Sequence, residues 1–148
     1  MLIKYRHHLP HWNLEGAYYF ITFKAISERF TEDEAEVILT VIKEGHRKKY
    51  TLVATQVMTD HIHLIFSPVG NEPLAKIMQW IKGVTSRRLN QHRGREGAIW
   101  MIDYYDRIIR NQRDMNEKLK YMFENPLRAG LVERSEDWYG WYLNEEAD

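Results

Sequence analysis

The sequence contains no cysteine, and it has no apolar run of the roughly 20 residues that a membrane-spanning helix needs. The first absence excludes disulfide bonds and thiolate metal sites, so a bound metal would need nitrogen or oxygen ligands. The N-terminal segment also lacks the apolar core of a secretory signal, and these absences together predict a cytoplasmic protein. The 148 residues show no repeats and are enough for a single domain spanning 1–148.

The formal net charge is zero, but the charges are unevenly distributed along the chain. Bases outnumber acids in 76–120, whereas acids outnumber bases in 28–44 and in 133–148. A basic middle segment between acidic segments indicates a local anionic partner. A solvated helix face with mixed charges would give the same pattern, so composition alone leaves both interpretations open.

Periodicity and turn residues divide the chain into seven predicted elements. Aromatic and β-branched stretches predict strands, and apolar residues three or four positions apart predict helices. The predicted strands are 16–25, 50–58, 61–66 and 98–110. The predicted helices are 31–49, 72–93 and 114–126. Thr31 and Asp114 are the expected N-caps of the first and third helices, and Asn125 and Pro126 mark the expected end of the third.

The order of these elements predicts an α+β fold. A strand–helix–strand unit repeated twice gives a ferredoxin-like βαββαβ sandwich with a four-stranded antiparallel sheet. The first two helices should cover one face of this sheet, and the extra C-terminal helix should lie over the other. The segment that follows this helix has no strong periodicity and receives no predicted element.

Two histidines, His61 and His63, interrupt the apolar stretch "TDHIHLIF". Alternate residues of a strand share one face, so the two imidazoles should project together while the intervening apolar residues face the helices. Neutral imidazole is a common ligand of divalent metals, but two ligands do not complete a site. Asp60 is adjacent but should point away, and Ile65 occupies the position where a histidine-triad hydrolase needs a third histidine. Two half-exposed histidines with hydrogen-bond partners would give the same pattern.

The third predicted helix carries Tyr121 and, one turn later, Asn125, so the two side chains lie on the same side of it. If this helix packs across the histidine face, the amide oxygen of Asn125 could complete a metal site beside the phenol of Tyr121. A metal can polarise a phosphodiester, and a phenolate can attack the phosphorus to form a covalent phosphotyrosine that a 3′-hydroxyl can later reverse. A tyrosine at the rim of the core is the alternative interpretation.

Five segments occur in the same order as in a known group of proteins. They are "HLPHWNLEGAYYFITF", "VMTDHIHLIF", "IMQWIKGVTSRRLN", "IWMIDYYDRIIRN" and "YMFENPLRAGLV". In these segments, which cover nearly the whole chain, the sequence resembles the REP-associated tyrosine transposases of the single-tyrosine HUH transposase superfamily. These proteins are associated with dispersed palindromic repeats in bacterial genomes. One departure is Thr59, where the family usually has proline, at a position that shapes a turn.

The resemblance implies a role for each candidate residue. His61 and His63 match the pair that binds Mg²⁺ or Mn²⁺, Asn125 matches the residue that can complete the metal shell, and Tyr121 matches the nucleophile. The implied substrate is single-stranded DNA, often folded as a hairpin, that is cut to give a 5′-phosphotyrosine and a free 3′-hydroxyl. The resemblance leaves open whether the protein acts as a monomer or a homodimer. A non-catalytic protein of the same fold that binds hairpin DNA or RNA is the alternative function.

Basic residues near these segments are candidate phosphate contacts, which give affinity without sequence information. They are Lys82, Arg87, Arg88, Arg107 and Arg110, with Arg93 and Arg95 in a glycine-flanked loop. A second candidate set is an aromatic and basic cluster near the N-terminus that could stack on or grip a hairpin. Its members are Tyr5, Arg6, His7 and His8. Solvated charges, and an N-terminal arm packed on the sheet edge, are the alternatives.

Overall fold

The structure is a computed structural model that describes residues 10, 12 and 16–145. Its elements follow the predicted order as far as the third long helix. They are β1 (Tyr19–Ala25), α2 (Glu32–Glu44), β2 (Tyr50–Val57), β3 (His61–Pro68), α3 (Leu74–Arg93), β4 (Trp100–Ile108), α4 (Gln112–Arg128), the 3-10 turn η1 (Ser135–Asp137) and β5 (Trp141–Leu143). Within the described residues, no helix is long and apolar enough to cross a membrane.

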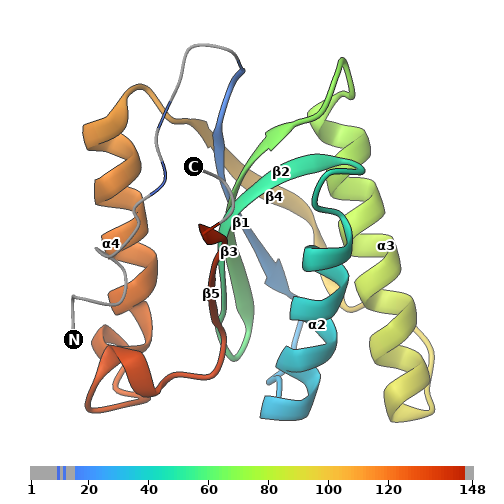
Figure 1. Ribbon diagram of the computed structural model, residues 1–148. Helices are drawn as coiled ribbons and strands as arrows, with labels where there is room; N and C mark the ends of the chain where they lie inside the picture. Colours follow the sequence, from blue (N-terminus) through green and yellow to red (C-terminus); the bar gives the residue numbers. More distant parts are fainter. Residues whose placement is uncertain (1–9, 11, 13–15, 146–148) are drawn as a thin grey trace.

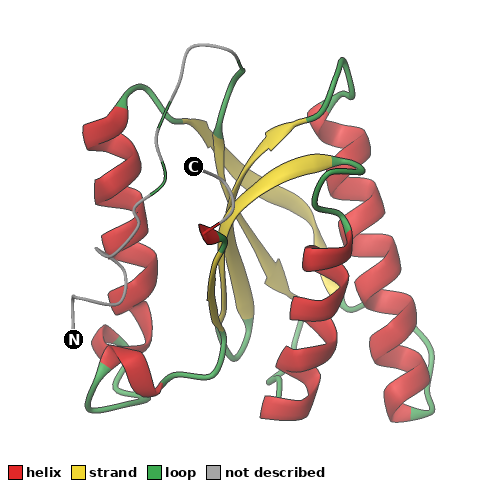
Figure 2. Cartoon of the chain, viewed as in Figure 1, coloured by secondary structure: helices red, strands yellow, loops and turns green. Residues whose placement is uncertain are grey.

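The five strands form one antiparallel sheet in the order β4-β1-β3-β2-β5. Figure 2 shows this sheet between α4 on one side and α2 and α3 on the other, which confirms the predicted α+β class and the placement of the helices. The predicted ferredoxin-like sheet of four strands is wrong by one strand, because β5 adds to the free edge of β2. A strand of three residues is too short to show an alternating pattern in the sequence.

Two cores lie on the two faces of the sheet. Ile62, Leu64 and Phe66 of β3 belong to the core under α2 and α3, as their alternation predicts. Ile65 faces the other way and packs with Phe123 and other apolar residues of α4. β3 is therefore covered on both faces, by α2 and α3 on one side and by α4 on the other (Figure 1). Its residues are buried apart from the partly exposed His61 and Pro68 at its two ends.

The first and third helices differ from their predicted limits. Thr31 caps α2 as predicted, in a capping box with Glu34, but the helix ends at Glu44 rather than at residue 49. The N-cap of α4 is Asn111, whose side chain accepts a hydrogen bond from the backbone N–H of Asp114. Asp114 was predicted to be the cap because its short side chain can also accept a capping hydrogen bond, but it lies in the first turn of the helix.

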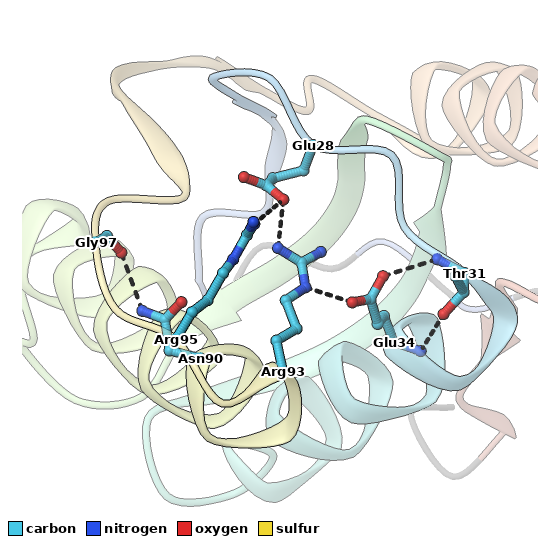
Figure 3. A network of polar contacts seen from close by, with 7 residues as sticks. All are labelled: Glu28, Thr31, Glu34, Asn90, Arg93, Arg95 and Gly97. Carbon is cyan, nitrogen blue, oxygen red and sulfur yellow. Dashed lines mark hydrogen bonds and ion pairs between the residues drawn. The ribbon is translucent and has the colours of Figure 1, made fainter.

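A network of ion pairs joins the ends of α2 and α3 on the face away from α4 (Figure 3). Arg93, at the end of α3, donates to Glu34 in the first turn of α2 and to Glu28 in the loop before it. Arg95 also pairs with Glu28, with 2.6 Å between Nη2 and Oε1. We call Glu28, Thr31, Glu34, Arg93 and Arg95 the closed network, because the buried acids are each paired with an arginine.

Candidate functional site

An open pocket of about 820 Å³ lies between the sheet and α4. Its lining residues come from β1, the start of β3, β4 and α4. They are Phe20, Thr22, Lys24, Ala25, Asp60, His61, His63, Tyr105, Glu117, Lys118 and Tyr121. The predicted histidine pair and the predicted tyrosine therefore meet in one cavity.

The two histidines project from β3 toward this pocket. Their ring centroids are 4.8 Å apart, with the rings nearly perpendicular, so both imidazoles can reach one ion. His63 is almost fully buried, at 4% exposure, and Phe20 stacks on its ring with 5.5 Å between centroids. The side chains of β3 thus divide as predicted, with the imidazoles on the α4 face.

One nitrogen of each imidazole is held by a neighbouring oxygen. The Nδ1 of His63 lies 2.8 Å from the hydroxyl of Thr22, which is its direct partner on β1. The Nδ1 of His61 lies 2.8 Å from a carboxylate oxygen of Asp60, although the side chain of Asp60 was predicted to point away. A proton on each Nδ1 leaves Nε2 as the nitrogen that can bind a metal, and such outer partners are typical of metal-binding histidines.

The electrostatics of His63 favour the neutral ligand form. Burial lowers its pKa to about 3, and the nearby charges of His61, Arg128 and Lys24 act in the same direction. The amide of Asn125 acts in the opposite direction, so it lies close to this ring. His63 is therefore an uncharged imidazole with a lone pair at physiological pH.

The helix α4 brings Tyr121 and Asn125 to the histidine face. The ring of Tyr121 lies 5.6 Å from that of His63 and 6.3 Å from that of Phe20, between centroids, while 45% of the residue stays exposed. A phenol that borders the imidazoles and still reaches solvent is accessible to a polymer substrate. The predicted packing of this helix across the histidines is what the structure shows.

Four buried side-chain polar atoms have no hydrogen-bond partner among the described residues, and three of them lie on the face that α4 covers. We call these three the open cluster: His63 Nε2, Asn125 Oδ1 and Gln56 Oε1. The fourth is Asn90 Oδ1, near the end of α3. Buried polar atoms are rarely left unpaired, so a concentration of them calls for a missing partner such as an ion.

The donor set consists of two imidazoles and one amide oxygen, which can hold a divalent cation. Across 10, 12 and 16–145, no three His, Cys, Asp or Glu side chains gather as a metal cluster. The residues that could hold an ion are two imidazoles and the amide oxygen of Asn125, and amide oxygens suit Mg²⁺ or Mn²⁺. Unpaired Nε2 and Oδ1 atoms beside a neutral imidazole match that requirement.

The proline that follows Asn125 does not end α4, contrary to the prediction, but it leaves one carbonyl of the helix without its usual backbone donor. Pro126 lacks the N–H that would bond to the carbonyl of Met122, four residues earlier. The amide nitrogen of Gln56, on β2, donates to that carbonyl instead, at 3.0 Å. The helix thereby continues to Arg128 and is tied to the sheet beside the pocket.

Arg128 is a residue of this site that the sequence analysis did not single out. Its guanidinium lies 4.5 Å from the centre of the Tyr121 ring and donates to the Tyr121 carbonyl. A cation over the ring restricts the orientation of the phenol. The helical spacing of seven residues between the two could have indicated this contact.

The predicted phosphate contacts fall in different places. Lys82 donates to the carbonyls of Met101 and Ile102, at 2.8 and 2.7 Å, and Arg88 pairs with Glu44. These two belong to α3, on the face away from the pocket. Arg87 is also on α3, and Arg93 and Arg95 belong to the closed network.

Among the predicted contacts that fall within the described residues, Arg107 of β4 lies beside the pocket and Arg110 precedes α4. Arg107 lies 6.0 Å from the ring centre of Tyr105, which lines the pocket, and Arg110 lies 3.7 Å from Asp114. Tyr5, Arg6, His7 and His8 lie outside the described residues. Two cations that were not predicted, Lys24 and Lys118, line the pocket itself.

These two lysines could have been found from spacing. Lys24 is two residues from Thr22 on β1 and so shares its face, and Lys118 is one turn before Tyr121 on α4. Neither spacing carries meaning until the pocket is known.

A model of the transposase family described as IS200-like matches residues 17–125. This chain belongs to the IS200-like transposase family. The match covers the histidine pair, Tyr121 and Asn125, and it confirms the resemblance that the five segments predicted. Two curated relatives of this transposase are described as REP-associated tyrosine transposases. The Haemophilus influenzae protein is 29% identical over 99 residues, which cover 60% of this chain and 56% of the relative. The Escherichia coli K12 protein is 25% identical over 99 residues, which cover 66% of this chain and 57% of the relative.

The chain thus spans little more than half the length of the curated relatives that it matches. A solved structure described as a REP-associated tyrosine transposase bound to a REP hairpin has a TM-score of 0.71 at 21% identity, over 86% of this chain and 76% of that one. A protein from Deinococcus radiodurans has a TM-score of 0.50 at 14% identity, over 76% of this chain and 92% of its own. At these identities the likeness shows a shared fold.

Proposed function

We propose that this IS200-like transposase cleaves and rejoins single-stranded DNA through a 5′-phosphotyrosine on Tyr121. His61, His63 and Asn125 would hold the divalent cation, Mg²⁺ or Mn²⁺. The observation that carries the proposal is the meeting of the Tyr121 phenol with His61 and His63 in one open pocket, beside the buried, unpaired Nε2 of His63 and Oδ1 of Asn125. A protein that only bound DNA would not need a nucleophile beside such a ligand set.

The chemistry is a single displacement at phosphorus. The phenol oxygen of Tyr121 bonds to the phosphorus as its proton leaves, and the bond from phosphorus to the 3′-oxygen breaks. The departing 3′-oxygen takes up a proton and becomes a hydroxyl, so the DNA 5′ end stays on the enzyme. A bound cation would neutralise charge that develops on the phosphoryl oxygens. Because the phosphotyrosine is a diester, the reverse attack by a 3′-hydroxyl rejoins strands.

Residues of the pocket have separate tasks in this step. Arg128 holds the ring of Tyr121. Thr22 and Asp60 orient the two imidazoles. Lys24 lines the pocket as a positive charge that can pair with a phosphate flanking the cleaved one, whereas Lys118 is held by Asp114 at 3.1 Å.

The proposed substrate is a hairpin formed by a palindromic repeat, because the solved relative described above is bound to a REP hairpin. The protein should be incubated with labelled hairpin oligonucleotides that carry single-stranded flanks, with Mn²⁺ or Mg²⁺. We expect a covalent protein–DNA adduct on denaturing gels that disappears with EDTA and in Tyr121→Phe. Tyr105→Phe is the matched control, because Tyr105 also lines the pocket and should leave the adduct intact.

An adduct that persists in Tyr121→Phe and disappears in Tyr105→Phe would reassign the nucleophile. Tight hairpin binding by the wild type with no adduct in either metal would support the non-catalytic binding protein instead. Electrophoretic mobility shifts on the same oligonucleotides measure that binding.

A further inference from the structure

Gln56 lies near the end of β2, directly opposite His63 in the antiparallel pair with β3. Residues directly opposite each other in such a pair project from the same face of the sheet, with Cβ atoms about 5 Å apart. Gln56 is fully buried, and it contacts α4 through its bond to Met122. Its side chain is therefore on the face that carries the histidines.

The orientation of this amide is set by chemistry. The carbonyl of Met122 can only accept, so the atom of Gln56 that lies 3.0 Å from it must be the amide nitrogen. Pro126 creates the demand for this donor, because it supplies no N–H to that carbonyl. The amide oxygen must then point elsewhere, and it has no partner in the part of the chain that the structure describes.

We propose that Gln56 Oε1 is a further ligand of the divalent cation, beside His63 and Asn125. This inference rests on the proposed function, because it places a fourth protein ligand at the same site. An unpaired amide oxygen buried in a protein costs free energy, and a cation would supply its missing partner. Mg²⁺ and Mn²⁺ favour oxygen ligands, so an amide fits them.

A single side chain then connects the cation to the helix of the nucleophile. The nitrogen of Gln56 holds the carbonyl of Met122, the residue next to Tyr121, and its oxygen holds the ion. The strand β2 thereby fixes the position of α4 relative to the histidines on β3. Strand pairing and the missing N–H of Pro126 together explain why a glutamine occurs near the end of this largely buried strand.

The test separates the oxygen from the nitrogen. Gln56→Leu removes both atoms, whereas Gln56→Glu removes the donor but keeps an oxygen ligand. Isothermal titration with Mn²⁺ alone should show at least about a tenfold loss of affinity in Gln56→Leu. Gln56→Glu should bind Mn²⁺ within about threefold of the wild type, or more tightly, because a carboxylate is a stronger ligand for this ion.

The matched control is Asn144→Leu. Asn144 is also a buried amide whose nitrogen donates to a backbone carbonyl, that of Leu52 at 2.9 Å, on another part of β2. Its substitution should lower the Tm, as both Gln56 variants should, without changing the Mn²⁺ affinity. Comparing Tm with affinity therefore distinguishes a lost ligand from a loosened fold.

Two results overturn the inference alone. If the wild type binds Mn²⁺ and Gln56→Leu binds it equally well, Gln56 is only a structural link between β2 and α4. The same conclusion follows if the Leu and Glu variants lose affinity equally, because the nitrogen is then the atom that matters. A wild type that binds no Mn²⁺ overturns the metal assignment of the proposed function as well, so the two failures are distinguishable.

Discussion

Two groups of polar side chains lie on opposite faces of the same sheet and differ in how their buried atoms are paired. In the closed network, each acid meets an arginine, and the side chains of Arg93, Glu28 and Glu34 are only 10–13% exposed. In the open cluster, buried nitrogen and oxygen atoms have no partner from the described residues. Both groups are buried and polar, so burial alone does not separate a structural group from a functional one.

The difference lies in what each group gains from folding. The closed network forms its bonds when the chain folds, so its free energy contributes to stability. The open cluster gives up hydration on folding and recovers no bond until a ligand arrives. Paired atoms should therefore control stability and the unpaired atoms should control binding, and substitutions in the closed network should leave ion binding unchanged.

The largest expected effect is on metal binding by His63→Leu. This change removes a ligand nitrogen and should lower the Mn²⁺ affinity at least about 100-fold, which corresponds to roughly 2.7 kcal/mol. The free energy of unfolding without metal should change by no more than about 1 kcal/mol, because the lost bond to Thr22 is offset by removal of the unpaired Nε2. Calorimetric titration and urea unfolding measure the two quantities. A loss of several kcal/mol in the metal-free protein would place His63 with the structural residues.

The second prediction reverses the pattern with Arg93→Met. The change leaves Glu28 and Glu34 without their shared partner and should destabilise the protein by about 3 kcal/mol. The Mn²⁺ affinity and the yield of adduct per folded molecule should stay within twofold of the wild type. Arg95→Met is the control, because Arg95 is 52% exposed and shares only Glu28, so its unfolding midpoint should move little. Lost metal binding in folded Arg93→Met would break the separation of the two faces.

The sequence predicted those parts of the site that depend on local geometry. The alternation of β3 placed His61 and His63 on one face, and helical spacing placed Tyr121 and Asn125 on one side of α4. These relations are set within one element, so no tertiary information is needed. The order of the elements up to α4 follows from the same kind of pattern.

The residues that the sequence did not reveal depend on contacts between distant elements. Gln56 is buried in β2, and its hydrogen bond to α4 forms because Pro126 removes a backbone donor from that helix, on the other side of the site. Lys82 appears free in the sequence, but in the fold it bonds to carbonyls of β4. Strand β5 was missed because a strand of three residues is too short to show an alternating pattern. The cap of α4 was assigned to Asp114 instead of Asn111 because both have short side chains that can accept the capping hydrogen bond.

The third prediction concerns the pH dependence of the closed network. Hydrogen bonding to Arg93 is the main cause that lowers the pKa of Glu34 below its usual 4.5, so the folded state binds the proton less strongly than the unfolded chain. The contribution of Glu34 to stability is thus present above about pH 4.5 and is lost as the pH falls through its lower folded pKa. In Glu34→Gln this part of the pH dependence should disappear. Urea unfolding from about pH 6 to pH 3 measures the difference between the two proteins, and parallel curves would contradict it.

The smallest expected effect compares a lysine of the pocket with a lysine of the opposite face. Lys24 lines the pocket, is exposed and should contact a phosphate, so Lys24→Met should weaken hairpin binding several-fold and reduce the slope of log affinity against log salt by about 0.7. Lys82→Met should leave that slope unchanged, because Lys82 is bonded to backbone carbonyls behind the sheet. Fluorescence anisotropy across a salt series distinguishes the two. Equal slopes in both variants would show that the DNA does not follow the pocket, and a reduced slope in Lys82→Met alone would move the DNA path to the face of α3.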